Sequence, residues 1–307
     1  MEQNNRQPSF RSSQVRGWVA HLWREWAVEG FRPILPVRMK PKPNEWSDSN
    51  LTAAWLGHST VLIDFFGTTI LTDPVLFRRI GVRIPFLFTI GPKRLTAPAL
   101  SIDQLPKIEF ILLSHAHFDH IDWRTLSHFD SSVKIITAPR TRDLLRWTGL
   151  RDITELRWGD RNSIETAAGK IDISAIPVKH WGARLQRDDY RGYNGYLIER
   201  EGRRIFFAGD TAMTDDFRQL RRHGSVDLII LPIGCYDPWI RSHSSPEQAV
   251  QMANDAGARF IMPVHHQTFR LSFEPFREPI ERFEAALRDQ PERIALREIG
   301  ETFVLPD

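Results

Sequence analysis

Apolar and polar positions alternate in short blocks along most of this chain. From residue 51 onward, apolar runs of strand length are separated by Gly, Pro and polar turns, which predicts β-strands rather than long helices. The runs come in two groups, and helical patterns follow each group. The first group covers 51–57, 60–67, 68–75, 108–114 and 133–139, and the second covers 170–181, 194–200, 203–211, 226–234 and 258–266.

The clearest helix signal follows the predicted strand at 226–234. Ser245 stands at an N-cap position, Gln248 completes a capping box with it, and Gly257 is placed to end the helix. Two groups of strands with helices after each predict an α/β fold, in which two sheets pack face to face with helices outside. Further helices are expected over 123–129, 140–149 and 274–287.

The first fifty residues have a different pattern. A polar start leads into a segment where Trp18, Leu22 and Trp26 recur every four residues, which predicts an amphipathic helix. We expect residues 1–50 to form an arm whose helix packs on a main domain of residues 51–307. A second interpretation is a helix that lies in a membrane surface, because Trp favours that interface.

Composition narrows the classes of protein further. With 41% hydrophobic and 26% charged residues, the chain is typical of a globular protein. Its first residues are polar and lack the apolar core expected of a signal peptide, and no apolar run reaches membrane-spanning length. A single cysteine, Cys235, excludes an internal disulfide and makes a small buried side chain its expected role. The net charge of +3 does not indicate a nucleic-acid partner. We therefore expect a cytoplasmic protein.

A dense histidine cluster lies directly after the predicted strand at 108–114, in the stretch LLSHAHFDHID. His115, His117, Asp119 and His120 fall within six residues. Histidine and carboxylate side chains are standard zinc ligands, so this spacing predicts a metal site rather than a polar loop with chance histidines. One cation could not easily take all four groups from so short a segment, whereas two adjacent cations could.

Partners for this cluster are expected from later strand ends. His180 follows AIPVK, Asp210 follows IFFAG, and His265 follows FIMPV. A single histidine after a strand is usually a surface or core residue, so each position is a weak signal alone. Three of them in the same local context, downstream of the dense cluster, form a pattern.

These motifs together resemble the metallo-β-lactamase superfamily. The HxHxDH signature occupies 115–120, and KHW, AGDT and VHHQTF stand at the later ligand positions. The chain is similar above all to the N-acyl-phosphatidylethanolamine-hydrolysing phospholipase D group. Further stretches carry that similarity: AWLGHSTVLID, LTDPV, GPKR, LPIGCYDP and HSSPEQAV.

The resemblance implies a four-layer αββα sandwich of two mixed sheets and a dinuclear zinc hydrolase. It implies that His115, His117 and His180 hold the first zinc and that Asp210 bridges both ions. Asp119, His120 and His265 would hold the second, although the adjacent His266 complicates that last assignment. Two such ions can share a hydroxide that attacks a phosphodiester. Mn²⁺ or Fe remain alternatives to Zn²⁺.

Three residues outside the signature are candidates for supporting roles. Asp73 in LTDP and His58 in LGHST could each orient a ligand histidine through its other ring nitrogen. For Asp73, a simple turn before Pro74 is an equally good interpretation. His243 stands just before the predicted helix that begins after Ser245, and a helix N-terminus suits a phosphate. Together with Asp119, His243 is our candidate catalytic residue, as a proton donor or a phosphate contact.

The segment 77–94 alternates arginines with apolar residues. If Arg79, Arg83, Phe86 and Phe88 are exposed, the apolar side chains could enter a lipid surface while the arginines meet phosphates. A loop buried under the sheet is the competing interpretation, because Phe is usually buried.

The resemblance thus implies a phospholipase D-type phosphodiesterase acting on N-acyl-phosphatidylethanolamine-like lipids, and we expect peripheral contact with the inner membrane face. The main alternative is a lactonase or phosphodiesterase of the same superfamily that acts on a small soluble substrate. A metal-binding scaffold without catalysis is a further alternative, which a missing ligand would indicate. No candidate ligand is missing. The sequence does not decide the oligomeric state, and a homodimer remains an alternative to a monomer.

Overall fold

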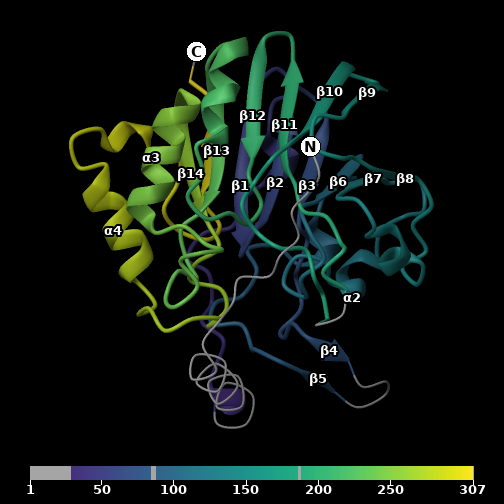
Figure 1. Ribbon diagram of the computed structural model, residues 1–307. Coiled ribbons are helices and arrows are strands. Elements are labelled where there is room, and N and C mark those ends of the chain that lie inside the picture. The colour runs from purple at the N-terminus through teal and green to yellow at the C-terminus, as the bar shows by residue number, and fades with distance from the viewer. Residues whose placement is uncertain (1–28, 84–87, 186–187, 307) are drawn as a thin grey trace.

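Two β-sheets form the centre of the computed structural model, which describes residues 29–83, 88–185 and 188–306 (Figure 1). Both sheets mix parallel and antiparallel pairs. The seven-stranded sheet has the order β15 (Thr302–Val304), β1 (Leu51–Gly57), β2 (Thr60–Phe65), β3 (Thr69–Thr72), β6 (Phe110–Leu113), β7 (Lys134–Thr137) and β8 (Ile153–Glu155). The six-stranded sheet has the order β14 (Ala258–Val264), β13 (Val226–Pro232), β12 (Arg203–Phe207), β11 (Gly195–Arg200), β10 (Gly169–Ile176) and β9 (Arg161–Thr166).

The sheets pack face to face because alternate residues of their strands point to opposite sides. In β12, Ile205 and Phe207 belong to the core between the sheets, whereas Phe206 belongs to a second core on the outer face. Central strands such as β13 are buried at every position, as expected for a sheet covered on both faces. The expected α/β fold with two facing mixed sheets is therefore confirmed.

Helices α3 (Pro246–Ala256) and α4 (Glu278–Ala286) cover the outer face of the six-stranded sheet (Figure 1). The predicted start of α3 is confirmed, since Gln248 N–H donates to Ser245 Oγ and the Gln248 side chain accepts from Ser245 N–H. Its end is confirmed as well, because Gly257 has a φ of 69°.

The helices expected over 123–129 and 140–149 are shorter in the structure than the sequence predicted. Helix α2 (Trp123–Leu126) lies within the predicted stretch 123–129. The helix expected over 140–149 is wrong in length, since only a 3-10 helix, Arg142–Leu145, forms there. The Glu155 carboxylate accepts from the backbone amides of Thr141 and Arg142, both at 2.8 Å, and so ties the start of this segment to β8. The short strands β8, β9 and β15 were not predicted.

A small hairpin projects from the lower end of the molecule, built from β4 (Val82–Arg83) and β5 (Thr89–Ile90) (Figure 1). The described part of the N-terminal arm runs beside its base, where Leu35 exchanges backbone hydrogen bonds with Leu95 and Ala97. The helix predicted around Trp18 lies outside the described residues, and so does Phe86. Among the described residues, no helix combines the length and apolarity needed to cross a membrane.

Candidate metal centre

The candidate ligands gather at one edge of the two sheets. In the seven-stranded sheet, β1, β3 and β6 run in the same direction, because β1 and β3 are both antiparallel to β2 and β3 is parallel to β6. Their carboxyl ends therefore meet, as do those of β10, β12 and β14 in the other sheet. The segments after these six strands carry His58, Asp73, His115, His180, Asp210 and His265.

The first group of ligand atoms comes from His115, His117, His180 and Asp210. His115 Nε2 lies 2.8 Å from His117 Nδ1, which lies 3.4 Å from His180 Nε2. Asp210 Oδ2 is 3.9 Å from His115 Nε2 and 3.8 Å from His180 Nε2. The structure therefore brings together the three histidines that the resemblance assigned to one ion, with Asp210 beside them.

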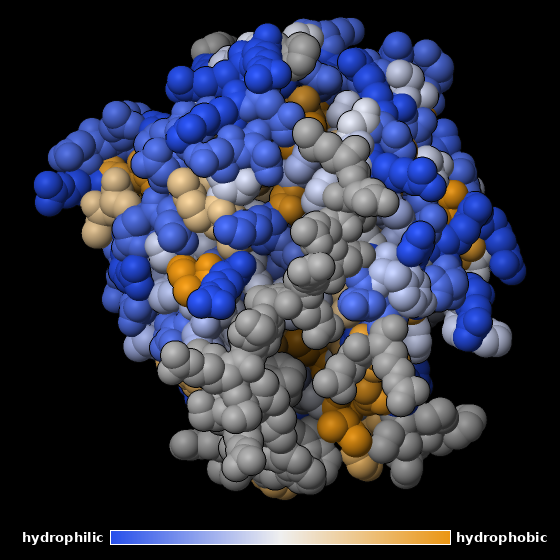
Figure 2. Space-filling model, in the orientation of Figure 1, coloured by the Kyte–Doolittle hydropathy of each residue, from blue (hydrophilic) through white to orange (hydrophobic). Residues whose placement is uncertain are grey.

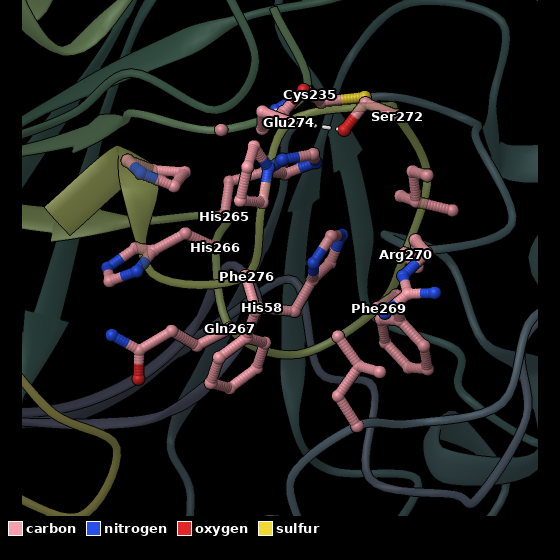
Figure 3. A pocket seen from close by; sticks show the side chains of 15 residues that line it. His58, Cys235, His265, His266, Gln267, Phe269, Arg270, Ser272, Glu274 and Phe276 are labelled. Atoms are coloured by element: carbon pink, nitrogen blue, oxygen red, sulfur yellow. Dashed lines mark hydrogen bonds between the residues drawn. The ribbon is translucent and has the colours of Figure 1, made fainter. Parts of the chain in front are cut away.

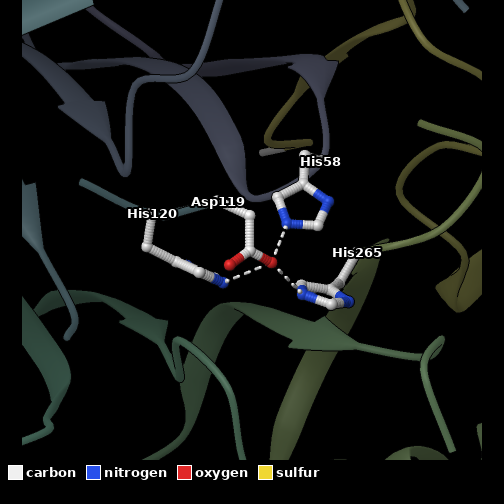
Figure 4. A group of neighbouring side chains, drawn as sticks. All are labelled: His58, Asp119, His120 and His265. Carbon is white, nitrogen blue, oxygen red and sulfur yellow. Dashed lines mark hydrogen bonds and ion pairs between the residues drawn. The ribbon is translucent and has the colours of Figure 1, made fainter. Parts of the chain in front are cut away.

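The second group comes from Asp119, His120, His265 and His58 (Figure 4). Asp119 Oδ2 lies 3.5 Å from His265 Nε2 and 3.6 Å from His120 Nε2. His58 Nε2 donates to the same oxygen at 2.9 Å. Sequence reasoning expected His58 to orient a ligand histidine, whereas its hydrogen bond goes to the carboxylate of the candidate ligand Asp119.

Asp210 joins the two groups through a single atom. Its Oδ2 lies 3.2 Å from both His120 Nε2 and His265 Nε2, in addition to its approach to the first group. Within the described residues, Asp210 Oδ1, His120 Nε2 and both ring nitrogens of His265 are buried without a hydrogen-bond partner. Buried polar atoms are costly unless something binds them, so this set of nitrogen and carboxylate donors fits metal ions.

The electrostatics prepare these groups for a cation. Burial lowers the pKa of His180 to about 4, and burial together with the neighbouring His180 lowers the pKa of His117 to about 3, so both rings are neutral. Burial opposes charge on Asp210, but His265 and His120 hold its pKa well below the usual range. Burial also opposes charge on His265, yet Asp210 raises its pKa to about 9. The aspartates thus attract positive charge, which bound cations would supply.

A layer of hydrogen bonds orients the candidate ligands. His120 Nδ1 donates to Asp73 Oδ2 at 2.6 Å, which is the contact predicted as one of two interpretations of Asp73. Ser114 Oγ donates to the same Asp73 oxygen at 2.5 Å and lies 2.9 Å from His115 Nδ1. His180 Nδ1 donates to the Ser242 carbonyl at 2.8 Å. These bonds leave the opposite ring nitrogens of the three histidines facing the centre.

Sequence reasoning missed the supporting roles of Ser114 and Ser242. Ser114 immediately precedes the histidine cluster, so its position in the motif was an available signal. Ser242 contributes a backbone carbonyl from the loop after β13, which no side-chain pattern could have indicated.

The structure separates His265 from His266. His265 faces Asp119 and Asp210, whereas the His266 ring packs on Trp55 with ring centroids 4.5 Å apart.

His265 and His266 both line a small cavity of about 30 Å³ that also contacts Cys235, whose thiol is buried (Figure 3). Burial raises the pKa of the Cys235 thiol well above its usual value, so it stays protonated there.

His243 reaches the same centre from the loop before α3. Its Nδ1 lies 3.9 Å from Asp210 Oδ2, and its ring centroid is 5.0 Å from that of His180. The ring is buried, and burial lowers its pKa well below the usual value. His243 therefore faces the centre as a neutral ring that can donate one N–H.

The residues predicted for a lipid surface occupy different positions. Arg79 is half-buried, and its guanidinium donates to the Gly91 carbonyl at 2.8 Å, at the base of the hairpin. Arg83 and Phe88 lie on the hairpin itself and are exposed. The competing interpretation, a loop buried under the sheet, does not hold for the described part of the hairpin.

Comparison with known proteins identifies the family of this chain. Residues 68–266 match the family described as "Beta-lactamase superfamily domain". An uncharacterized protein of Mycobacterium tuberculosis is 31% identical over 281 residues, covering 86% of this chain and 71% of that protein. The N-acyl-phosphatidylethanolamine-hydrolyzing phospholipase D 1 of Caenorhabditis elegans is 31% identical over 260 residues, covering 80% of this chain and 72% of the relative.

A solved structure supports the fold. Igni18, described as a novel metallo hydrolase from Ignicoccus hospitalis, aligns with a TM-score of 0.63 at 19% identity, covering 84% of this chain and 99% of that one. The family match spans more than half of the 307 residues. The chain therefore belongs to the metallo-β-lactamase superfamily.

Proposed function

We propose that this protein is a dinuclear zinc-dependent phosphodiesterase of the phospholipase D type, acting on N-acyl-phosphatidylethanolamine-like lipids. The observation that carries the proposal is the meeting of two ligand groups at Asp210 Oδ2. Likeness to a phospholipase D of that class over 80% of this chain supports the substrate. The reaction class, metal-dependent hydrolysis, rests on the set of ligand atoms and on the family.

In this proposal, His115, His117 and His180 would hold one ion, Asp119, His120 and His265 would hold the other, and Asp210 would serve both. When bound, two zinc ions supply Lewis acidity and lower the pKa of water to near 7, which is the chemistry that phosphodiester hydrolysis at neutral pH needs. His58 holds Asp119 by donating to its Oδ2. Asp73 and the Ser242 carbonyl fix the rings of His120 and His180.

His243 is the candidate residue for direct contact with the substrate phosphate. It stands next to the first turn of α3, whose N-terminus adds positive potential, and its neutral ring can donate an N–H to a phosphate oxygen. Asp119 belongs to the second ligand group, and we retain it as a candidate catalytic residue. Neither role requires a nucleophilic side chain from the protein.

The hairpin supports a lipid rather than a soluble substrate. Val82, Phe88 and Ile90 are 51%, 47% and 43% exposed. In Figure 2, apolar residues come into view where Figure 1 shows β4 and β5. The stretch 74–102 has no acidic residue, and two of its basic residues, Arg78 and Arg83, are exposed, which suits an anionic surface.

Product analysis tests the proposed activity. Zinc-loaded protein incubated with N-acyl-phosphatidylethanolamine is expected to release phosphatidic acid and the N-acylethanolamine, and Asp210→Asn is expected to abolish release. Metal analysis should find two zinc ions per chain. Turnover of a soluble phosphodiester or lactone without release from the lipid would favour the alternative substrate class. Full activity of Asp210→Asn would overturn the two-metal proposal.

Vesicle flotation tests the hairpin separately. The wild type is expected to float with anionic vesicles, and a Val82→Asp/Phe88→Asp variant is expected to lose that binding. Val304→Asp serves as a matched control, since Val304 is 49% exposed on β15 rather than on the hairpin. Equal flotation of the double variant and the control would refute the membrane role of the hairpin.

A further inference from the structure

Arg184 lies four residues after His180, in the connection between β10 and β11, and its side chain reaches the segment that carries the histidine cluster. The guanidinium lies 4.0 Å from the ring centroid of Phe118 and 4.7 Å from that of Trp123. Phe118 stands between His117 and Asp119, and Trp123 begins α2. One aromatic ring therefore lies inside the HxHxDH motif, and the other begins the helix just after it.

The same guanidinium binds the backbone at both ends of this segment. Arg184 Nη1 donates to the Ala116 carbonyl at 2.9 Å and to the Ile121 carbonyl at 3.0 Å. These two carbonyls flank residues 117–120, which supply three candidate ligands. One nitrogen thus holds the two ends of the ligand segment at a constant separation.

Within the part of the chain that the structure describes, no ordinary ion pair explains the position of Arg184. Among the described residues it forms no salt bridge within 4.0 Å, and its Nε is buried without a hydrogen-bond partner. Arg184 is half-buried, and the carboxylates of Asp122, Asp188 and Asp119 act on its charge only from beyond ion-pair distance. Its contacts are instead directed at the metal-binding segment.

We propose that Arg184 is a positioning residue that preorganises the metal centre by fastening the 116–121 segment to the strand connection that carries His180. This inference rests on the metal-centre part of the proposed function and not on its substrate. Without the clamp, His117, Asp119 and His120 can move relative to His180, so metal binding must first reorder the segment. The clamp therefore acts on metal affinity more than on the global fold.

A merely structural role predicts a different result. If Arg184 only stabilises the fold, its replacement lowers the thermal midpoint but leaves the metal affinity and ligand geometry of the folded protein unchanged. If it preorganises the centre, a folded variant binds metal more weakly and with altered geometry. Metal affinity and a metal spectrum therefore distinguish the two roles.

The test compares Arg184→Met and Arg184→Lys with the full-length wild type. Metal-free proteins are titrated with Zn²⁺ against a chromophoric chelator, and with Co²⁺ while the visible d–d absorption of the bound ion is recorded. Arg146→Met is the matched control, because Arg146 also stacks on an aromatic ring, that of Trp147 at 5.0 Å, but lies on the exposed surface. Circular dichroism establishes that each variant is folded.

We expect Arg184→Met to lower zinc affinity about 10- to 100-fold, as outer contacts of metal sites typically do, and to shift the cobalt spectrum. Arg184→Lys keeps the charge but lacks the planar fork, so an intermediate loss is expected. If Arg184→Met does not fold, the same measurements on Arg184→Lys decide the matter. Wild-type affinity and an unchanged cobalt spectrum in a folded variant would overturn the inference.

The outcome is separable from the test of the substrate. A wild type that binds zinc but releases no product from the lipid contradicts the phospholipase D proposal and leaves the clamp intact. A wild type that binds no metal overturns the clamp together with the metal centre.

Discussion

Asp73 offers a sharp test of the candidate metal centre, because one carboxylate supports a ligand in each group. It is fully buried after β3, where Oδ1 accepts from Ser114 N–H at 2.7 Å and Oδ2 accepts from His120 Nδ1 and Ser114 Oγ. Ser114 Oγ in turn contacts His115 Nδ1. Asp73 therefore orients His120 directly and His115 through Ser114.

Replacing Asp73 by Asn keeps the shape but converts one oxygen into an NH₂ group. Whichever way the amide is placed, a donor then faces an N–H or a hydroxyl that donated before. A hydrogen bond to a charged group contributes about 1.5–3 kcal/mol. Because about 1.4 kcal/mol corresponds to a factor of ten in binding, zinc affinity should fall roughly 10- to 100-fold.

Competition with a chromophoric chelator measures this change on the folded protein. Asp64→Asn is the matched control, since Asp64 is also buried and accepts from a backbone amide, that of Gly67 at 2.8 Å, on a strand of the same sheet. We expect the control to keep wild-type zinc affinity. An Asp73→Asn variant that binds zinc as tightly as the control would refute the argument that this carboxylate orients the ligands.

Three further predictions concern other parts of the fold. Gly234→Ala should weaken zinc binding in chelator competition, because its Cβ would lie 2.3 Å from the carbonyl oxygen of His265; unchanged affinity would contradict this. Ser245→Ala removes the N-cap of α3 and should cost about 1 kcal/mol, seen as a lower midpoint in thermal unfolding. Arg282 lowers the pKa of Glu247 to about 2, so this pair stabilises the fold above about pH 4.5 and loses that contribution as the pH falls towards 2. Because the Glu247 side chain is 49% exposed, the free energies of unfolding of the wild type and Glu247→Gln should differ by less than about 1 kcal/mol. Denaturant unfolding at several pH values should show this difference vanish towards pH 2, and a difference that does not change with pH would refute the assignment.

Local patterns predicted the elements whose formation depends on neighbouring residues. The apolar runs predicted strands such as β6 and β13, and the capping box at Ser245 predicted where α3 begins. The helix expected over 140–149 was wrong in length, because the backbone bonds there are of the 3-10 kind, as from Leu144 N–H to the Thr141 carbonyl. Strand β9 was missed because a hairpin partner, rather than its own apolar residues, defines it.

The amino-acid sequence by itself determined which side chains are available as ligands, because the HxHxDH spacing is local and the later candidates each follow an apolar run. Only the tertiary structure decided how they combine. His265 and His266 are adjacent in sequence, yet the turn after β14 directs one ring to Asp210 and the other to Trp55. The sharing of Asp210 Oδ2 and the support from Ser242 and Arg184 depend on strands packed from two sheets, and no local pattern encodes such distances.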